Sequence, residues 1–418
     1  ATTMKARYIH KKLHDTAKGI NGRIVVLTGA RQTGKTTMSR NYLPEYVYLS
    51  VEDPVASEGL MQLTAAQWKS LYPQAILDEV QKRPRLIESI KSVYDQWDEP
   101  RYVLLGSSQL LLLNKVKESL AGRCAIMEVF PLTLPELQTD DIHQTVKESP
   151  FQQLLMQGEL PMLFPSFVLD PNYAAKMTAW QHYQQYGGYP ALTDTQRTDE
   201  ERREWLRNYV RTYLERDVRD LAAMQDLEPY SRLQQVLALQ TGTLCNTTSL
   251  ATHIGMSTTT VKRYLQYLTL SYQTIVLQPW EKNTSRRLIK SPKIHYLDNG
   301  VLQAVLQKQA MPNGAEFESL VIAEIYKQAK QVTNDIAFYH LRTADGREID
   351  LLIETPEGYY AFEIKLTDHV VGHDARHLRV LPQILDKPLL HAFILSNDVT
   401  MAQFGDNITA IHAAQFLG

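Results

Sequence analysis

The octapeptide GARQTGKT at residues 29–36 constrains this chain more than any other feature, because it fits the pattern GxxxxGK[ST] in full. It follows the β-branched run at residues 24–26 and precedes a helix-permissive stretch that begins at Thr36. Glycine adopts backbone conformations that a Cβ atom blocks, so a glycine-rich turn in this setting can aim successive N–H groups at an anion. The pattern therefore predicts a phosphate-binding loop, and the alternative is a chance glycine turn between a strand and a helix.

Each residue type in the loop suits one part of a nucleoside triphosphate. Lys35 supplies a cation for the β- and γ-phosphates, the hydroxyl of Thr36 can ligate Mg²⁺, and the following helix adds partial positive charge at its N-terminus. We therefore expect ATP and Mg²⁺ as cofactors. The residues expected to contact the nucleotide are Gly29, Ala30, Arg31, Gln32, Thr33, Gly34, Lys35, Thr36 and Thr37.

A second signal is the acidic pair Asp78 and Glu79, which directly follows the short apolar run at residues 75–77. Ligands of open α/β sheets bind at the carboxyl ends of the strands. Asp78 is therefore expected to hold Mg²⁺, directly or through water, and Glu79 to polarise the attacking water. A solvated acidic pair at a strand end is the alternative.

The first third of the chain alternates short β-like runs with helical patterns, which favours an α/β fold with a parallel sheet and helices on both faces. Ser107 follows the fourth run and is a candidate γ-phosphate sensor, unless it only caps a helix. Arg123, in the segment SLAGR, is a candidate for reaching a nucleotide in its own or a neighbouring subunit of a homo-oligomer; the alternative is a surface guanidinium. The runs are residues 24–27, 46–49, 75–77, 102–105 and 125–129.

Composition excludes several classes of protein. The chain has 418 residues, of which 44% are hydrophobic, enough for about three domains. Its two cysteines, Cys124 and Cys245, are too few for a disulfide framework, so a reducing cytosol is expected. The longest apolar runs, residues 103–105 and 110–113, are too short to cross a membrane, and no membrane partner is expected.

Residues 233–280 read as helix, turn, helix and an extended run. Ser257 caps a second helix over residues 258–270 whose apolar positions share one face, which leaves Lys262 and Arg263 on the surface. The net charge of −2 is uninformative, but residues 262–293 contain seven cations and one acid, Glu281. A winged helix-turn-helix that contacts DNA is predicted, with protein contacts as the alternative. The cations are Lys262, Arg263, Lys282, Arg286, Arg287, Lys290 and Lys293.

Residues 347–354 and 359–366 flank a turn and predict a hairpin in which Asp350 faces Glu363 and Glu348 faces Lys365. Ile349, Leu351, Ile353, Phe362, Ile364 and Leu366 are expected on one face, and Asp350, Glu363 and Lys365 on the other. Opposed carboxylates repel unless a cation lies between them, so a second Mg²⁺ or Mn²⁺ is predicted there, with Lys365 beside the attacking water. Glu318, from a helix over residues 316–330, is a further candidate ligand. The alternative is that Lys365 merely neutralises a polar sheet face.

Seven motifs occur together and in a specific order: GARQTGKT, ILDEVQ, GSS, SLAGR, PLTLPEL, GGYP and YLERDV. This combination resembles a bacterial and archaeal family of AAA-type ATP-binding proteins over nearly the whole chain. The resemblance implies a C-terminal half with a winged helix and a tail similar to PD-(D/E)xK nucleases, a restriction-endonuclease-like α/β fold. Ile349 stands where such nucleases usually have the proline of the PD pair.

The resemblance and the residue patterns together predict four parts: a P-loop ATPase domain (1–175), a helical lid (176–232), a winged helix-turn-helix (233–300) and a nuclease-like domain (301–418). The predicted function is that of a cytoplasmic, Mg²⁺-dependent ATPase whose nucleotide state is coupled to a DNA-contacting C-terminal half. Two rivals stay open: an ATP-regulated, metal-dependent DNA nuclease, and a non-hydrolysing switch that gates assembly with a partner protein.

Overall fold

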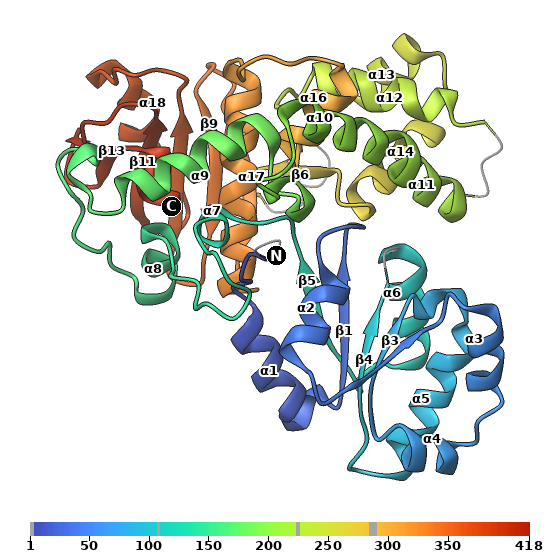
Figure 1. Ribbon diagram of the computed structural model, residues 1–418. Helices are drawn as coiled ribbons and strands as arrows, with labels where there is room; N and C mark the ends of the chain where they lie inside the picture. The colour runs from blue at the N-terminus through green and yellow to red at the C-terminus, as the bar shows by residue number, and fades with distance from the viewer. Residues whose placement is uncertain (1–3, 107–108, 223–225, 284–290) are drawn as a thin grey trace.

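The computed structural model describes residues 4–106, 109–222, 226–283 and 291–418. It opens with a five-stranded sheet, blue to cyan in Figure 1, in which every neighbouring pair of strands is parallel. The sheet order is β2-β3-β4-β1-β5. The predicted parallel α/β arrangement is thereby confirmed. The strands are β1 (Ile24–Gly29), β2 (Val47–Ser50), β3 (Gln74–Asp78), β4 (Arg101–Leu105) and β5 (Ala125–Val129), and the helices are α1 (His10–Lys18), α2 (Lys35–Tyr42), α3 (Pro54–Met61), α4 (Ala65–Leu71), α5 (Pro84–Gln96) and α6 (Gln109–Ser119).

Both faces of this sheet are buried because side chains alternate along each strand. In β1, Ile24 and Val26 belong to the core that contains Ile87 and Ile90 of α5. The intervening Val25 and Leu27 belong to a second core that contains residues of α1 and α2. All six residues of β1 are buried, so the strand that leads into GARQTGKT is fixed from both sides.

The middle of the chain is helical, as predicted. Asn208 is followed by η5 (Tyr209–Leu214), one stretch of π-helix, a form that often marks functional sites. The chain turns at Gly187, which ends α9, and at Gly255, which lies between α13 and α14 with a left-handed φ of 77°. The helices are α7 (Leu134–Leu137), α8 (Pro150–Gln157), α9 (Tyr173–Tyr186), α10 (Asp199–Asn208), α11 (Glu215–Ala222), α12 (Glu228–Leu239), α13 (Thr247–Ile254) and α14 (Thr258–Leu270).

The C-terminal part contains an eight-stranded mixed sheet in the order β12-β13-β11-β10-β9-β8-β6-β7. The extended run expected as the wing is β6, which pairs with β7 and joins this sheet because its Gln278 and Pro279 pair with β8. The elements are β6 (Thr274–Pro279), β7 (Lys293–Tyr296), α16 (Asn299–Leu306), α17 (Gly314–Val332), β8 (Ala337–Arg342), β9 (Glu348–Glu354), β10 (Tyr359–Ile364), α18 (Arg376–Arg379), β11 (Leu389–Ser396), β12 (Ala402–Gln403), β13 (Ile408–His412) and α19 (Ala413–Leu417).

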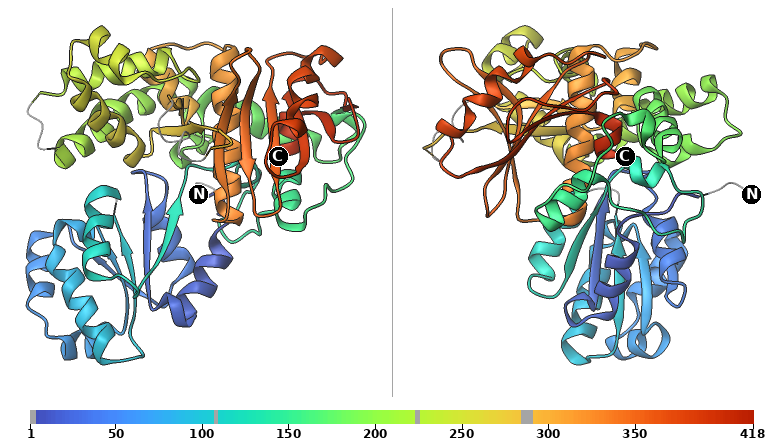
Figure 2. Two further views of the ribbon diagram at one scale, coloured as in Figure 1. Left: turned by 180° about the vertical axis from the view of Figure 1, so that it is seen from behind. Right: turned by 90° about the vertical axis from the view of Figure 1, so that its left-hand side faces the viewer.

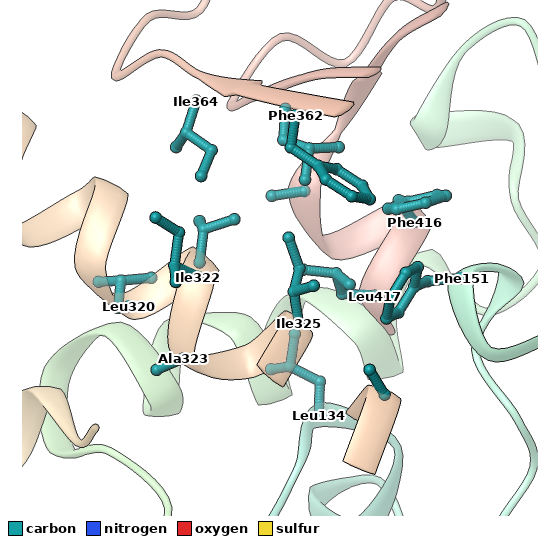
Figure 3. Close-up of a cluster of buried hydrophobic side chains, with 14 of the residues drawn as sticks. Leu134, Phe151, Leu320, Ile322, Ala323, Ile325, Phe362, Ile364, Phe416 and Leu417 are labelled. Carbon is teal, nitrogen blue, oxygen red and sulfur yellow. The ribbon is translucent and has the colours of Figure 1, made fainter. Parts of the chain in front are cut away.

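The segment after the first sheet packs on the C-terminal sheet. Figure 3 shows Leu134 and Phe151 beside Ile325 of α17, Phe362 of β10 and Phe416 of α19. The predicted domain boundary at residue 175 therefore falls within a segment that packs on the C-terminal half, although the division into four parts stays a prediction. Truncating a buried phenylalanine such as Phe362 costs about 3–5 kcal/mol, so this cluster is a main source of stability.

The two views of Figure 2 place the five-stranded sheet below the rest of the molecule, with the carboxyl ends of its strands directed towards the middle helices and the second sheet. The phosphate-binding loop follows β1 and so lies on that side. Among the described helices, none combines the length and the apolar character that crossing a membrane requires. Cys124 and Cys245 are both free.

Candidate functional site: the phosphate-binding loop and the carboxylate cluster

The loop GARQTGKT has the backbone that an anion cradle requires. Gly29 ends β1 with φ 149°, and a Cβ atom built there would lie 2.2 Å from the carbonyl oxygen of Val129. Gln32 and Gly34 also have positive φ values, 67° and 92°, and Gly34 caps the N-terminus of α2. Glycine at residue 29 is therefore required both by the left-handed backbone and by the close approach of β5.

Lys35 lies folded into its own loop. Its ammonium group donates hydrogen bonds to the carbonyl oxygens of Gly29 (2.9 Å) and Ala30 (2.7 Å). Burial lowers the pKa of Lys35 to about 8, and the nearby carboxylates of Glu79 and Asp78 oppose this shift. The lysine is thus held at the loop by groups that a phosphate oxygen can replace.

The predicted magnesium ligands lie together. Thr36 donates a hydrogen bond to Asp78 Oδ2 at 2.6 Å, and the hydroxyl of Tyr48 donates to the same oxygen at 2.6 Å. Asp78 is 8% exposed. A hydroxyl and a carboxylate in contact are the hard oxygen donors that Mg²⁺ uses beside phosphate and water, so the residues fit this ion.

Glu79 follows Asp78 in a left-handed conformation with φ 59°, which is rare for a residue with a side chain. Its Oε2 accepts a hydrogen bond from Gln81 at 2.5 Å. Strained backbone held in this way is common at catalytic positions. Gln81, from the motif ILDEVQ, is therefore a residue that positions Glu79.

Arg7 contacts the backbone of the phosphate-binding loop. The sequence patterns did not identify this residue. It is 5% exposed, and its guanidinium donates to the carbonyl oxygen of Thr33 (2.7 Å) and to Glu136 Oε2 (2.8 Å). Glu136 is fully buried and belongs to the motif PLTLPEL. The motif PLTLPEL thus pointed to Glu136 in the sequence, but no sequence pattern identified Arg7, with which Glu136 forms an ion pair.

The middle helices contact the loop directly. Arg31 forms an ion pair with Asp217 of α11, with 2.7 Å between Nη2 and Oδ1. The hydroxyl of Tyr209, in η5, donates to the carbonyl oxygen of Arg31 at 2.9 Å. The ring of Tyr213 lies 5.5 Å from the guanidinium of Arg31. Asp217 and Tyr213 belong to the motif YLERDV, which gives that motif a physical role at the nucleotide loop.

A third contact joins the same region to the C-terminal sheet. Tyr272, just before β6, lies 3.2 Å from Thr28 Oγ1 and donates to Glu128 Oε2 at 2.9 Å. Burial raises the pKa of Tyr272 far above its ordinary value. Its hydroxyl therefore stays protonated and bridges β1 and β5 to the C-terminal sheet.

A cavity of about 320 Å³ opens beside the loop and α2. Gln32, Gly34 and Thr37 line it, together with Pro190 of the motif GGYP and Arg197. Ligand pockets have volumes of about 300–1,000 Å³, so this cavity is large enough for part of a nucleotide.

Two predicted residues are not placed at this loop. Ser107 lies outside the described residues, so its sensor role stays a prediction. Arg123 precedes β5 at the amino end of the sheet, where it pairs with Asp95 at 2.8 Å. Because β5 must cross the sheet at about 3.3 Å per residue, Arg123 lies far from the loop of its own chain. Of the two predicted roles of Arg123, this position leaves open the one in which it reaches a nucleotide in a neighbouring subunit.

The carboxylates predicted in the C-terminal part converge. Glu318 of α17, Asp350 of β9 and Glu363 of β10 influence one another electrostatically. Burial, with Asp350 next, raises the pKa of Glu318 to about 8 and that of Glu363 well above its ordinary value. Burial also raises the pKa of Asp350. Lys365 lies 3.7 Å from Glu363.

Lys293 also belongs to this cluster, which corrects its assignment to a basic surface. It is 7% exposed and its ammonium lies 4.0 Å from Glu318 Oε1. Of the other predicted surface cations, Lys262, Arg263 and Lys282 are exposed, and Arg286, Arg287 and Lys290 lie outside the described residues. From composition alone, the buried strand β7 could not be distinguished from a charged surface segment.

The hairpin register is confirmed at its turn, where Glu354 pairs with Tyr359. The faces expected for this hairpin were wrong at Ile349, which packs with Leu352 in the core on the other side of the sheet. The cause is a bulge in β9, where Asp350 and Leu351 together face His340 of β8. Both faces of this sheet are buried, and the expectation of one polar face was also wrong. Leu366, expected in the core, is 46% exposed because it lies beyond the end of β10.

The bulge also alters the predicted opposition of charges. Asp350 N–H donates to Glu363 Oε1 at 3.1 Å, and Asp350 Oδ2 accepts from Ile364 N–H at 2.8 Å. Glu348 pairs with Arg342 of β8 at 3.2 Å rather than with Lys365. Within the described part of the chain, no three histidine, cysteine or acidic side chains form a group arranged to hold a metal ion. The second metal stays a prediction that this geometry does not favour.

Family models match three successive parts of the chain. Residues 21–138 match the model described as "AAA domain", so this part of the chain is similar to AAA domains. Residues 177–311 match "Domain of unknown function (DUF8612)", and residues 313–416 match "Domain of unknown function (DUF4143)". The matched residues include the phosphate-binding loop, Asp78 and Glu79, and the match supports ATP binding and hydrolysis in general.

Relatives and solved structures resemble most of the chain. An uncharacterized protein of Mycobacterium tuberculosis is 29% identical over 405 residues, which cover 94% of this chain and 81% of that protein. An uncharacterized protein of Methanocaldococcus jannaschii is 23% identical over 371 residues, covering 84% and 76%. The Walker-type ATPase PABY2304 of Pyrococcus abyssi is similar in structure with a TM-score of 0.46, at 14% identity over 73% of this chain and 98% of that one.

Proposed function

We propose that this chain is a cytosolic, Mg²⁺-dependent ATPase whose nucleotide state is transmitted to a DNA-contacting C-terminal half. The observation that carries the proposal is the ion pair between Arg31, inside the phosphate-binding loop, and Asp217, on the middle helix α11. A ligand can shift a conformational equilibrium only through contacts that differ between the states. Arg31 offers such a contact, because phosphate oxygens and Asp217 compete for the same guanidinium.

For hydrolysis, Lys35 stabilises charge on the γ-phosphoryl group and Glu79 orients the attacking water. Thr36 and Asp78 would hold Mg²⁺, which when bound neutralises charge on the phosphates. The backbone N–H groups of residues 29–34 fix the phosphate chain. The lid residue Pro190, whose Cγ would lie 4.0 Å from a Cβ atom at Gly34, helps to exclude water from the loop.

Two variants test the ATPase assignment. Lys35→Ala is expected to abolish ATP binding in calorimetry, because the only lysine in the loop is removed. Glu79→Gln is expected to keep ATP binding but to reduce phosphate release by at least about 100-fold, as expected when a general base is removed. Equal rates of phosphate release for wild type and Glu79→Gln would refute the role of Glu79. Absence of release in wild type with intact ATP binding would favour the assembly-switch alternative.

DNA contact is proposed for α14, whose Lys262 and Arg263 are exposed next to a turn and a hairpin. A helix in this position can enter a major groove. Replacing both residues with alanine should weaken binding of duplex DNA and reduce the slope of its salt dependence by about one for each phosphate that is no longer neutralised. Lys11→Ala/Lys12→Ala, in the exposed part of α1, is the control. Unchanged affinity and salt slope in the α14 variant would refute this role of α14.

The second candidate is an ATP-regulated nuclease, and it is favoured by the convergence of Glu318, Asp350 and Glu363 with Lys365 and Lys293. Lysine side chains can stabilise the negative charge that develops on a phosphoryl group during cleavage. Wild type and Asp350→Asn should be incubated with linear, branched and single-stranded DNA plus Mg²⁺ or Mn²⁺. Cleavage by wild type that Asp350→Asn lacks would support this candidate, and equal cleavage or none would exclude it.

A further inference from the structure

A second pocket lies between α10, η5 and α16, and its volume is about 370 Å³. None of the residues that line it belongs to the phosphate-binding loop or to the carboxylate cluster. It lies in the part of the chain that matches a domain of unknown function. Its chemistry is therefore separate from the ATPase site.

The pocket is cationic. Arg203, Arg207 and Arg211 recur every four residues and line one side, and Lys308 lines another. Arg207 pairs with Glu200 at 2.7 Å, and Lys308 pairs with Glu316. Within the described part of the chain Arg203 and Arg211 form no ion pair, and no acidic residue lines the pocket. Such a field selects an anion, and guanidinium groups suit phosphate.

Gln303 of α16 supplies an independent signal. It lines the same pocket and is 7% exposed, yet both its amide oxygen and its amide nitrogen lack a hydrogen-bond partner among the described residues. Buried polar groups are nearly always paired, so this amide is suited to a ligand that presents a donor and an acceptor side by side. The edge of a nucleobase does so, and it is a known bidentate partner of glutamine.

We propose that this pocket is a second nucleotide site, which binds a nucleoside phosphate independently of the ATPase loop. The phosphate lies against Arg203 and Arg211, and the base edge pairs with Gln303. Met311, which is 69% exposed and lines the pocket, offers an apolar contact for the base. The volume falls in the range of small-molecule sites and is too small for a duplex.

The test uses the full chain with Lys35→Ala, so that the first site does not contribute. Calorimetric titration with AMP, GMP, adenosine and inorganic phosphate should give saturable binding of at least one nucleoside monophosphate, with one site per chain. Arg203→Gln and Arg211→Gln should each weaken this binding about tenfold or more, because each variant removes a charge-assisted hydrogen bond. Gln303→Leu should weaken nucleotide binding and leave phosphate binding unchanged.

Arg216→Gln, which alters an exposed arginine outside the pocket, is the control and should bind as the parent does. Melting temperatures identify any variant that fails to fold, and Gln303→Leu removes an unpaired amide without removing charge. The proposal is overturned if Lys35→Ala protein binds no nucleoside phosphate. It is also overturned if inorganic phosphate binds as tightly as the nucleotides, or if only DNA or RNA oligonucleotides bind. Failure of the ATPase assignment would appear separately, as normal ATP turnover by Lys35→Ala.

Discussion

Asp217→Asn should weaken the connection between the phosphate-binding loop and the middle helices, because it removes the charge that pairs with Arg31. The ion pair with Arg31 is mostly buried, since the two side chains are 18% and 8% exposed. Exposed ion pairs contribute about 0–1 kcal/mol, whereas removing one partner of a fully buried pair costs about 3–5 kcal/mol. The geometry lies between these limits, and we expect the free energy of unfolding to fall by about 1–3 kcal/mol in the absence of nucleotide.

The assay is a double-mutant cycle of melting temperatures with Asp217→Asn, Arg31→Met and the double variant. Because the two side chains share one interaction, the melting temperature of the double variant should be at most slightly lower than that of the less stable single variant. Glu204→Gln, on the exposed face of α10, is the control and should melt as wild type does. Additive destabilisation in the double variant would contradict a direct energetic coupling.

The cycle should then be repeated with ATP and Mg²⁺ in a Glu79→Gln background, in which turnover is stopped. If phosphate oxygens take Arg31 from Asp217, the penalty of Asp217→Asn should shrink towards zero when ATP is bound. The same penalty with and without ATP would refute the proposed competition for Arg31, even if the chain hydrolyses ATP normally.

Three further predictions concern the loop and the carboxylate cluster. Gly29→Ala should lower the melting temperature and abolish ATP binding, because its Cβ atom would lie 2.2 Å from the carbonyl oxygen of Val129; an unchanged melting curve would contradict this. Arg7→Met removes the cation that pairs with the buried Glu136 and should cost about 3–5 kcal/mol in unfolding, part of which Arg7→Met/Glu136→Gln should recover. Burial raises the pKa of Glu318 to about 8, so the folded chain holds a proton that the unfolded chain releases above about pH 4.3. Stability should therefore fall as the pH rises from about 4.5 to 8, and Glu318→Gln should flatten that slope in melting curves.

The sequence predicted those parts of the molecule whose causes are local. The five strands of the first sheet and the loop after β1 follow from short β-branched runs and from glycines at fixed spacing. Ser257 was expected to cap α14, and its hydroxyl accepts a hydrogen bond from the N–H of Thr260. Each of these features depends on residues within a few positions of one another, so one sequence is enough to find them.

The sequence did not predict contacts that join distant segments. Arg7 meets Glu136 across 129 positions, and Arg31 meets Asp217 across 186. Lys293 was assigned to a surface because its neighbours in sequence are basic, whereas sheet pairing turns its side chain towards Glu318. The bulge at Asp350 was also missed, since an extra residue in one strand leaves no mark in an alternating pattern.

Three of the long-range contacts lie at the phosphate-binding loop and the residues beside it, and this has a consequence for mechanism. Arg31 reaches α11, Thr28 reaches Tyr272 before β6, and Arg7 ties Thr33 to Glu136, so three successive parts of one loop region are each held by a different segment of the chain. A rearrangement of the loop around phosphate must therefore alter at least one of these contacts. Packed interfaces respond to such changes by switching between discrete arrangements rather than by deforming gradually. The phosphate-binding loop is thus placed where a change in nucleotide can bias the position of the middle helices and the C-terminal sheet, which a loop solvated on its outer side could not do.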